Sequence, residues 1–168
     1  MDKITLERIK LIHPKYRDEV FQIYEEICKE LTGDAFCRFT HTYRDEKTQN
    51  ALYAQGRTAP GSKVTNARWL ESEHNFGIAV DIAMIYNNGK SASWDTAKDW
   101  DKDGVADWLE VVKIFNKYNW KWGFFNSKGQ RYDLPHFGKV TGYTVAQLRN
   151  KYKKGDVFID NGIKYVNI

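Results

Sequence analysis

The spacing of apolar residues predicts two amphipathic helices, one near the N-terminus and one past the middle of the chain. The first covers about residues 15–31, begins near Pro14 and is ended by Gly33, and the second covers residues 107–118. Apolar side chains recur every three or four positions in both segments, so they share one face of a helix. Those faces consist of Val20, Ile23, Ile27 and Leu31 in the first segment and of Trp108, Val111, Val112 and Phe115 in the second.

Three further segments have the pattern of strands. Residues 36–43 alternate between apolar and polar side chains and carry Arg44 to their end. Residues 76–86, FGIAVDIAMIY, are almost entirely apolar, which is typical of a buried central strand. Asp81 is the only charged residue among them. The segment NWKWGFF, residues 119–125, predicts another strand.

Capping and turn residues predict the connections. Asp45 is a suitable N-cap for a helix over residues 45–55, and Gly56 is a suitable stop. The next segment, residues 57–72, is rich in small polar residues and contains a Pro-Gly pair, which predicts a long loop. Long loops in compact domains often carry function.

The last part of the chain contains two strong local signals. Thr144, with Gln147 three residues later, is a capping-box signature for a short helix, and an Asn-Gly pair at 161–162 between apolar alternations predicts a hairpin. We therefore expect an α+β fold, with helices around a small antiparallel sheet and a C-terminal β-hairpin. One domain should span residues 1–168, with residues 141–168 as a helix-and-hairpin extension.

Composition narrows the function classes. The 168 residues are 42% hydrophobic, and no apolar run approaches the ~20 residues that a transmembrane helix needs. The net charge of 26 − 22 = +4 is too small to indicate a nucleic-acid partner, despite a basic run at 149–154. Cys28 and Cys37 cannot form a disulfide framework, so we expect reduced thiols. We expect a monomer that does not insert into membranes.

Asp81 needs a compensating partner, because a lone carboxylate in a buried apolar strand costs several kcal/mol. An arginine such as Arg44 or a metal ion would compensate it, and the sequence leaves both open. His74 stands seven residues earlier, which is about 23 Å in an extended chain. A shared site therefore requires a turn at residues 75–77, which Gly77 can supply.

The segment DLPHF adds Asp133 and His136, with Pro135 fixing the backbone between them. Two histidines and one carboxylate with an open fourth position are a typical ligand set for catalytic zinc. A second carboxylate that does not bind the metal can then take a proton from water. By residue type His13 and His41 are also candidate ligands, and we interpret them as surface or strand histidines.

Four segments, in this order, resemble the zinc-dependent L-alanyl-D-glutamate peptidases of phage endolysins and bacterial wall-remodelling enzymes. They are YRDEKTQNALYAQGRTAPGSKVTNA, SEHNFGIAVDI, WKWGFF and DLPHF. These enzymes are related to D-alanyl-D-alanine carboxypeptidases and vancomycin-resistance D,D-dipeptidases. The resemblance covers about residues 36–140, which we take as the catalytic core, and the pattern S-x-H-x-x-G-x-A-x-D followed by P-H is its most specific part.

The resemblance implies a role for each residue of the candidate site. His74, Asp81 and His136 would bind zinc at the sheet, and Asp133 would act as general base and acid. Arg44 would stabilise the polarised carbonyl or the oxyanion. Acyl transfer develops negative charge on oxygen, and a fixed guanidinium beside zinc stabilises that charge more in the transition state than in the ground state.

Two residues near this site have two interpretations each. Ser72 resembles a substrate contact of the family, and a loop or cap serine is the alternative. Arg57 could bind a substrate carboxylate, or it could brace the loop.

Two positions depart from the family pattern. Gly123 is followed by Phe124 where the family commonly has a second glycine, so the cleft could be narrower or its specificity altered. Glu73 places a carboxylate beside the ligand histidine; it could compete for the role of base, but we expect it to be solvated.

Residues 99–110, DWDKDGVADWLE, match the template of a calcium-binding loop, with glycine at the sixth position. Crowded carboxylates suit Ca²⁺ and repel each other without it. The alternative is a solvated acidic turn that caps the helix beginning near residue 107, because no helix is predicted before the loop and the eighth position is alanine. The candidate ligands are Asp99, Asp101, Asp103, the Val105 carbonyl, Asp107 and Glu110.

We therefore expect a zinc metallopeptidase that hydrolyses the stem peptide of peptidoglycan at the bond between L-Ala and D-Glu. A D-Ala-D-Ala carboxypeptidase on the same scaffold is the nearest alternative, and a non-catalytic, calcium-stabilised wall-binding module is a more distant one. Residues 149–168 could contact anionic wall polymers or pack on the core. The first residues show no secretory signal, which fits a phage lysin that is cytoplasmic until a holin releases it, or a cytoplasmic recycling enzyme.

Overall fold

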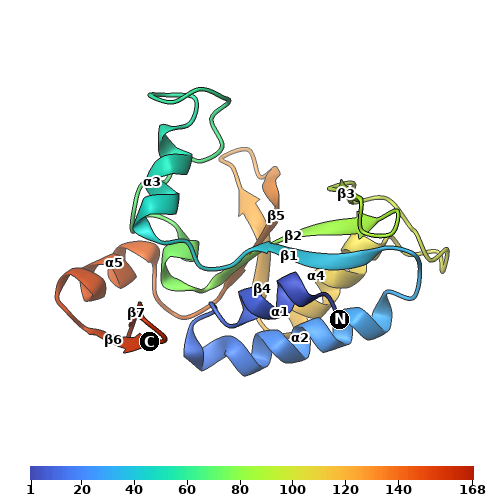
Figure 1. Ribbon diagram of the computed structural model, residues 1–168, viewed down its shortest axis with the longest axis horizontal. Helices are drawn as coiled ribbons and strands as arrows, with labels where there is room; N and C mark the ends of the chain where they lie inside the picture. The colour runs from blue at the N-terminus through green and yellow to red at the C-terminus, as the bar shows by residue number, and fades with distance from the viewer.

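A five-stranded antiparallel sheet forms the centre of the computed structural model, which describes all residues from 1 to 168 (Figure 1). Four strands follow one another across the sheet in the order β1-β2-β5-β4, and the short β3 pairs with the end of β2. This confirms the predicted α+β class with an antiparallel sheet. The strands are β1 (Phe36–His41), β2 (Ala79–Tyr86), β3 (Ser91–Ser93), β4 (Trp120–Phe125) and β5 (Arg131–Lys139).

Three helices pack together on one side of the sheet, while α3 and the loop that follows it stand on the other side, where the tip of the β4–β5 hairpin also projects (Figure 1). The buried aromatic side chains of Phe39, Phe115, Trp120 and Phe137 join the strands to the packed helices. No helix is long and apolar enough to cross a membrane. The helices are α1 (Lys3–Ile9), α2 (Arg17–Glu30), which follows a 3₁₀ turn η1 (Pro14–Tyr16), α3 (Glu46–Ala54) and α4 (Asp107–Lys117).

The predicted helices and most strands are confirmed, with one corrected helix end. Helix α2, predicted over residues 15–31, ends at Glu30, with Leu31 in an extended conformation, so Gly33 does not terminate it. Gly33 is needed for space instead, because a Cβ there would lie 2.8 Å from the Cβ of Asp101. The Asp45 side chain caps α3 by accepting a hydrogen bond from the Thr48 amide, as expected.

The prediction of a strand over residues 76–86 is wrong at its start. The chain forms a 3₁₀ turn, η2 (Glu73–Phe76), and β2 begins only at Ala79. Gly77 lies between them with a φ of 68°, a left-handed conformation that favours glycine, so the expected turn is present. Strand β5 and helix α1 were not predicted from the pattern of the sequence.

The C-terminal segment packs on the rest of the domain. It comprises α5 (Val145–Lys153), β6 (Val157–Asp160) and β7 (Ile163–Val166), and the capping box and Asn-Gly turn are formed as predicted. Tyr165 and Val166 are buried, and the Tyr165 hydroxyl donates to the Leu11 carbonyl at 3.0 Å. His13 is buried under this hairpin, with Nε2 2.8 Å from the Val166 carbonyl, so it is neither a surface histidine nor part of a strand.

Candidate metal centre

The register of the sheet brings two of the predicted ligands together. In the β2–β5 pair the Cα of Asp81 lies opposite that of His136, so both side chains lie on the same face of the sheet. Four residues of β5, numbers 133–136, lie between the paired positions 132 and 137, and only Gly123 stands opposite them on β4. This bulge interrupts the ladder and turns Asp133 and His136 towards the site.

The 3₁₀ turn η2 delivers the third predicted ligand. Ser72 caps the turn, and the backbone reversal at Gly77 returns the chain to β2, so His74 lies over the strand that carries Asp81. The Arg44 amide donates to the His74 carbonyl at 3.0 Å, which ties the turn to the segment that follows β1. The turn at residues 75–77 thus brings His74 close to Asp81, which an extended chain would not do.

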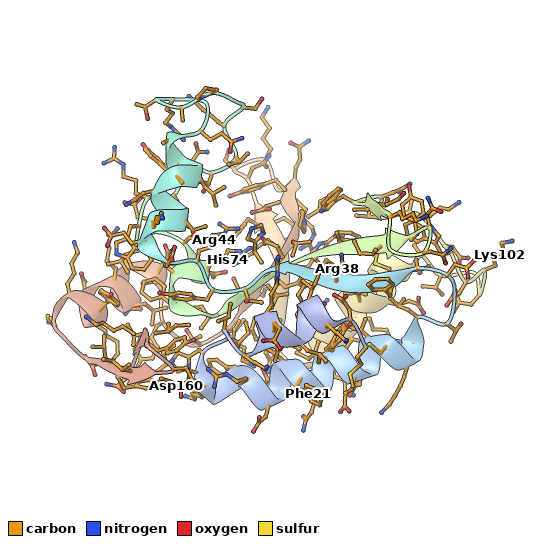
Figure 2. All side chains as sticks on the ribbon, in the orientation of Figure 1. Phe21, Arg38, Arg44, His74, Lys102 and Asp160 are labelled. Carbon is orange, nitrogen blue, oxygen red and sulfur yellow. The ribbon has the colours of Figure 1, made fainter.

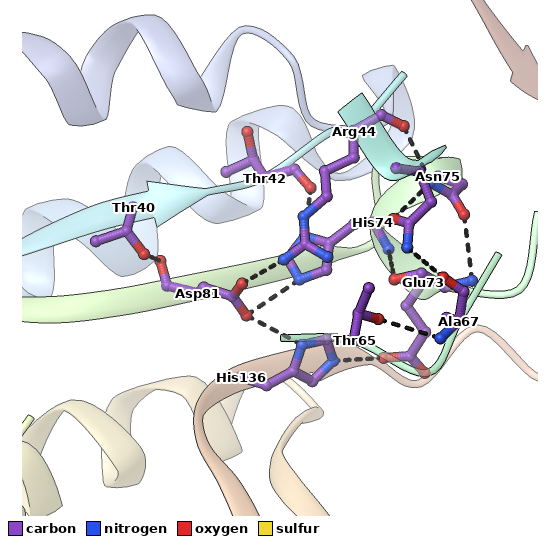
Figure 3. Close-up of polar contacts among 12 residues, drawn as sticks. Thr40, Thr42, Arg44, Thr65, Ala67, Glu73, His74, Asn75, Asp81 and His136 are labelled. Atoms are coloured by element: carbon purple, nitrogen blue, oxygen red, sulfur yellow. Dashed lines mark hydrogen bonds and ion pairs between the residues drawn. The ribbon is translucent and has the colours of Figure 1, made fainter. Parts of the chain in front are cut away.

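Three side chains converge on the Asp81 carboxylate (Figure 3). His74 Nε2 lies 3.0 Å and His136 Nδ1 3.1 Å from Asp81 Oδ1, while Arg44 Nη2 donates to Asp81 Oδ2 at 2.7 Å. Burial raises the pKa of Asp81, but the two histidines outweigh it and hold that pKa well below 3.8. The sequence left two alternatives for the partner of Asp81, an arginine or a metal ion. The structure has Arg44 beside Asp81 and also two histidines that could bind a metal with it.

The outer nitrogen of each histidine already has a partner. His74 Nδ1 donates to the Thr42 carbonyl at 2.6 Å, and His136 Nε2 lies 2.8 Å from Glu73 Oε2. With the protons on these outer nitrogens, both inner nitrogens direct lone pairs at Asp81 Oδ1. Three electron-rich atoms within 4.8 Å of one another then need a cation between them, so the residues fit a metal ion.

The carboxylates around His136 favour a positive charge at this position. Burial lowers its pKa, but hydrogen bonds with Asp81 and Glu73 outweigh burial and raise the pKa to about 9. The position therefore attracts positive charge strongly. A divalent cation bound by deprotonated ligands would supply this positive charge in place of the proton.

The cluster lies in a cleft of about 540 Å³ between the loop at 64–74 and the strands of the β4–β5 hairpin. Asp133 and Arg44 line the same cleft. Burial is the main reason why the pKa of Asp133 is raised above 3.8, and the negative charge of Asp81 adds to it. Asp133 also has a φ of 55°, a strained conformation for a residue with a side chain, and such strain is common in functional sites.

Glu73 contacts the site instead of being solvated as expected. Its carboxylate lies beside His136 Nε2, and a side chain at Gly138 would collide with it. A carboxylate on the outer nitrogen of a ligand histidine fixes the orientation of the ring. The expectation of a solvated Glu73 is therefore wrong, because β5 approaches the turn closely across Gly138.

The other predicted site residues occupy different positions. Ser72 lines the cleft and accepts a hydrogen bond from the His74 amide at 3.4 Å, as a cap does. The Arg57 guanidinium donates to the Tyr53 and Thr65 carbonyls at 2.7 and 3.0 Å, which corresponds to the bracing alternative. His41 is exposed and belongs to no cluster of potential ligands.

One residue of the site was missed by sequence reasoning, and a second, Phe124, was noted there only as a departure from the family pattern. Asn75 is buried next to His74 and holds four hydrogen bonds, and its position directly before the apolar segment 76–86 was the only available signal. The ring of Phe124 stacks on His136 with centroids 4.7 Å apart, and it lines the cleft. The side chain of Phe124 therefore fills space along the wall of the cleft that a glycine would leave open.

The acidic loop at 99–110 lies away from this cleft, and Figure 2 shows its residue Lys102 at one end of the molecule, far from His74. The chain has no helix before the loop, and α4 begins at Asp107, as predicted. Burial, followed by repulsion from Asp103 and Asp101, raises the pKa of Glu110 to about 7.

Residues 65–139 match the family model described as D-alanyl-D-alanine carboxypeptidase, within peptidase family M15. This segment is a peptidase M15 domain. The M15 domain contains His74, Asp81, Asp133 and His136, whereas Arg44 precedes it. M15 peptidases are metallopeptidases, and the His-Asp-His group is able to bind a metal.

The chain is similar in sequence to one named protein and in fold to another. The chain is 45% identical over 102 residues to the peptidoglycan L-alanyl-D-glutamate endopeptidase CwlK of Bacillus subtilis (strain 168). The match covers 60% of this chain and 59% of CwlK. The fold is similar to the crystal structure of the L-Ala D-Glu endopeptidase ChiX of Serratia marcescens, with a TM-score of 0.52 over 83% of this chain and 89% of ChiX. At 15% identity, this likeness concerns the fold alone.

Proposed function

We propose that this chain is a zinc-dependent peptidoglycan endopeptidase that hydrolyses the bond between L-Ala and D-Glu in the stem peptide. The observation that carries the proposal is the convergence of His74 Nε2 and His136 Nδ1 on Asp81 Oδ1 in a cleft that Asp133 and Arg44 also line. The name of the relative CwlK supports the choice of substrate and bond.

Zinc is the metal that we assign to His74, Asp81 and His136. Two imidazole nitrogens and one carboxylate oxygen suit Zn²⁺ and leave a fourth position open. When bound, the ion supplies Lewis-acid chemistry that activates water and polarises the scissile carbonyl. Thr42 and Glu73 hold the two histidine rings in the orientation that this role needs.

Asp133 is the proposed general base and acid. As a carboxylate, it takes a proton from the attacking water at one of its oxygens and delivers that proton to the nitrogen of the departing amine. Its raised pKa makes it a better proton acceptor than an exposed aspartate, because burial disfavours its charged form. It contacts no metal ligand through a hydrogen bond, so its oxygens are free for this role.

Arg44 is the proposed stabiliser of the oxyanion. Its guanidinium is held by Asp81 at Nη2, and its Nε is buried without a partner. Negative charge develops on the carbonyl oxygen as water adds, and a fixed cation at the cleft stabilises that charge at little reorganisation cost.

The description of the family model gives a second candidate, a D-Ala-D-Ala carboxypeptidase. Such an enzyme must recognise a free C-terminal carboxylate. Arg57, the candidate for binding a substrate carboxylate, is engaged by backbone carbonyls and by Asn66. We therefore favour the endopeptidase. It would act either on the cell wall, as a phage lysin released through a holin, or on wall fragments, as a recycling enzyme in the cytoplasm.

Mass spectrometry of purified peptidoglycan digested with the zinc-loaded protein tests the proposal. We expect new peptides with N-terminal D-Glu, or its amidated form, and none in a chelator control. Release of free D-Ala would identify the carboxypeptidase instead. Absence of any product despite stoichiometric zinc would contradict both peptidase assignments and favour a wall-binding module.

Two variants separate metal binding from proton transfer. Asp133→Asn should keep zinc and lose at least 100-fold in kcat/KM, because general acid–base catalysis contributes roughly 10²–10⁴-fold. His136→Ala should lose both zinc and activity. Asp18→Asn is the matched control, because Asp18 is exposed at the start of α2 and should change neither.

A further inference from the structure

The loop at 99–110 gathers the oxygen atoms of five acidic side chains at the start of α4. One set of ligand atoms comes from Asp99, Asp101 and Asp107, and a second from Asp101, Asp103 and Glu110; within each set the atoms lie within 4.8 Å of one another. Six or more oxygens around one Ca²⁺ at about 2.4 Å would span such distances. Asp101 belongs to both sets, so the two sets adjoin each other.

Buried carboxylate oxygens without a partner point into this cluster. Asp107 is fully buried and Glu110 is 5% exposed, yet Asp107 Oδ2 and Glu110 Oε2 have no hydrogen-bond donor. Asp101 Oδ1 is also buried without a partner. A buried charged oxygen with no partner costs more free energy than almost any other polar group. Three such oxygens within two adjoining sets of carboxylates indicate a site for a cation.

Other carboxylate oxygens of the cluster hold the loop in place. Asp99 accepts from the amides of Lys102 and Gly104 at 2.6 and 3.1 Å, and Asp107 Oδ1 accepts from the Trp100 amide at 2.8 Å. Asp107 thus uses one oxygen to fold the loop, and its other oxygen is buried without a partner. Gly104 has a φ of 98°, a conformation that favours glycine, and a Cβ at this position would meet no other atom. Glycine is therefore suited to this position by its backbone conformation and not by lack of space.

We propose that residues 99–110 bind one calcium ion, through the carboxylates of the five acidic residues and the Val105 carbonyl. An all-oxygen ligand set of this size suits Ca²⁺, whereas Zn²⁺ prefers nitrogen and sulfur, and Mg²⁺ requires a stricter octahedron that keeps several waters. The site is separate from the His-Asp-His cluster and does not depend on the proposed peptidase function.

Two contacts connect the calcium site to the rest of the fold. Asp101 Oδ2 accepts from the Thr32 amide and hydroxyl at 3.2 and 3.1 Å, which joins the loop to the end of α2. On α4, which starts inside the loop, Phe115 stacks on Phe137 with centroids 4.2 Å apart, and Phe137 is the neighbour of His136. Calcium at the loop should therefore stabilise the domain as a whole, without taking part in the chemistry of the cleft.

Calorimetric titration of CaCl₂ into the zinc-loaded, calcium-free protein tests this inference, with excess Mg²⁺ in the buffer. We expect one calcium per chain and a rise in Tm of about 5–10 °C at 100 times Kd. Terbium is a second probe, because Trp100 lies within the loop and should sensitise the luminescence of Tb³⁺ bound there. Calcium should displace that signal.

Glu110→Gln should weaken calcium binding at least tenfold and remove the rise in Tm. In calcium-free buffer the same variant should be no less stable than the wild type, since it removes one of several repelling charges. Asp103→Asn is the second variant, because Asp103 is exposed and the amide oxygen can still accept from the Val105 amide. Asp18→Asn, far from the loop at the start of α2, is the control for net charge.

Three results would overturn the inference. They are the absence of calcium binding to the wild type, wild-type affinity in both loop variants, and an equal loss of Tm by Glu110→Gln with and without calcium. The last result would mean that Glu110 serves packing alone.

Discussion

Replacing Asn75 by alanine should destabilise the protein more than any other single change near the cleft that leaves the candidate ligands intact. The Asn75 side chain is buried and accepts from the amides of Leu70 and Ser72 at 3.0 and 3.2 Å. It donates to the Arg44 carbonyl at 3.1 Å and to Gln49 Oε1 at 3.2 Å. These bonds tie together the loop before the site, the turn that carries His74 and the segment that carries Arg44.

The magnitude follows from these four hydrogen bonds. Each contributes about 1 kcal/mol net, and a buried partner that stays unsatisfied costs ~1–3 kcal/mol. We therefore expect Asn75→Ala to lower the free energy of unfolding by about 4 kcal/mol. For a chain of this size the corresponding fall in Tm is about 8–16 °C.

Urea unfolding followed by circular dichroism, on the zinc-loaded protein, measures this loss. Asn116→Ala is the matched control, since Asn116 is exposed on α4, makes no side-chain hydrogen bond and should change stability by less than ~0.5 kcal/mol. A loss below about 1 kcal/mol for Asn75→Ala would refute the idea that this side chain holds the site together. Wild-type kcat/KM in a folded Asn75→Ala protein would refute its link to Arg44 and His74.

Three further changes test other parts of the account. Asp2→Asn keeps the N-cap of α1 but removes the ion pair with Arg38 at 2.9 Å. Burial raises the pKa of Asp2, but hydrogen bonds with Arg38 and Thr5 outweigh it and lower that pKa below 3.8. The variant should therefore be less stable than the wild type by ~1–2 kcal/mol at neutral pH. This difference in stability should disappear as the pH falls through the pKa of Asp2 in the folded protein. Urea midpoints at two pH values measure it, and a difference that does not change with pH would contradict the reasoning. Gly123→Ala should lower kcat/KM at least tenfold, because its Cβ would lie 2.7 Å from the Tyr132 carbonyl in the bulge, whereas Gly89→Ala, with a similar φ and nothing nearby, should keep activity in the same assay. Glu73→Ala should weaken zinc binding 10–100-fold by freeing the ligand histidine, and Glu73→Gln, which can still accept a hydrogen bond, should restore most of it; equal zinc affinity in all three proteins by competition titration would exclude that role.

Local rules predicted most of the fold. Helices α2 and α4 have clear apolar faces, α3 and α5 have side-chain caps, and the Asn-Gly turn of the last hairpin needs positive φ values that those residues tolerate. Strand β5 was missed because the bulge around Pro135 breaks its alternation. Helix α1 was missed because it is short, and the Asp2 cap that begins it stands at the very start of the chain.

The candidate site could be predicted only in part. Asp81 was recognisable as a charge that needs partners, and the resemblance named the histidines that supply them. The position of Glu73 depends on how closely β5 approaches the turn across Gly138, a contact between residues 65 positions apart that no local pattern reveals. Arg57 could not be assigned from the sequence, because one of its bracing carbonyls, that of Thr65, belongs to a loop whose return towards the end of α3 no local pattern predicts.

The most direct test of the central claim is anomalous diffraction at the zinc edge from crystals of the zinc-loaded protein. The account predicts one strong peak about 2.0–2.2 Å from His74 Nε2, His136 Nδ1 and the Asp81 carboxylate. Glu73 should contact the outer nitrogen of His136 in the same crystals. A zinc peak elsewhere, or His136 bound through Nε2 with Glu73 displaced, would contradict the metal centre described here.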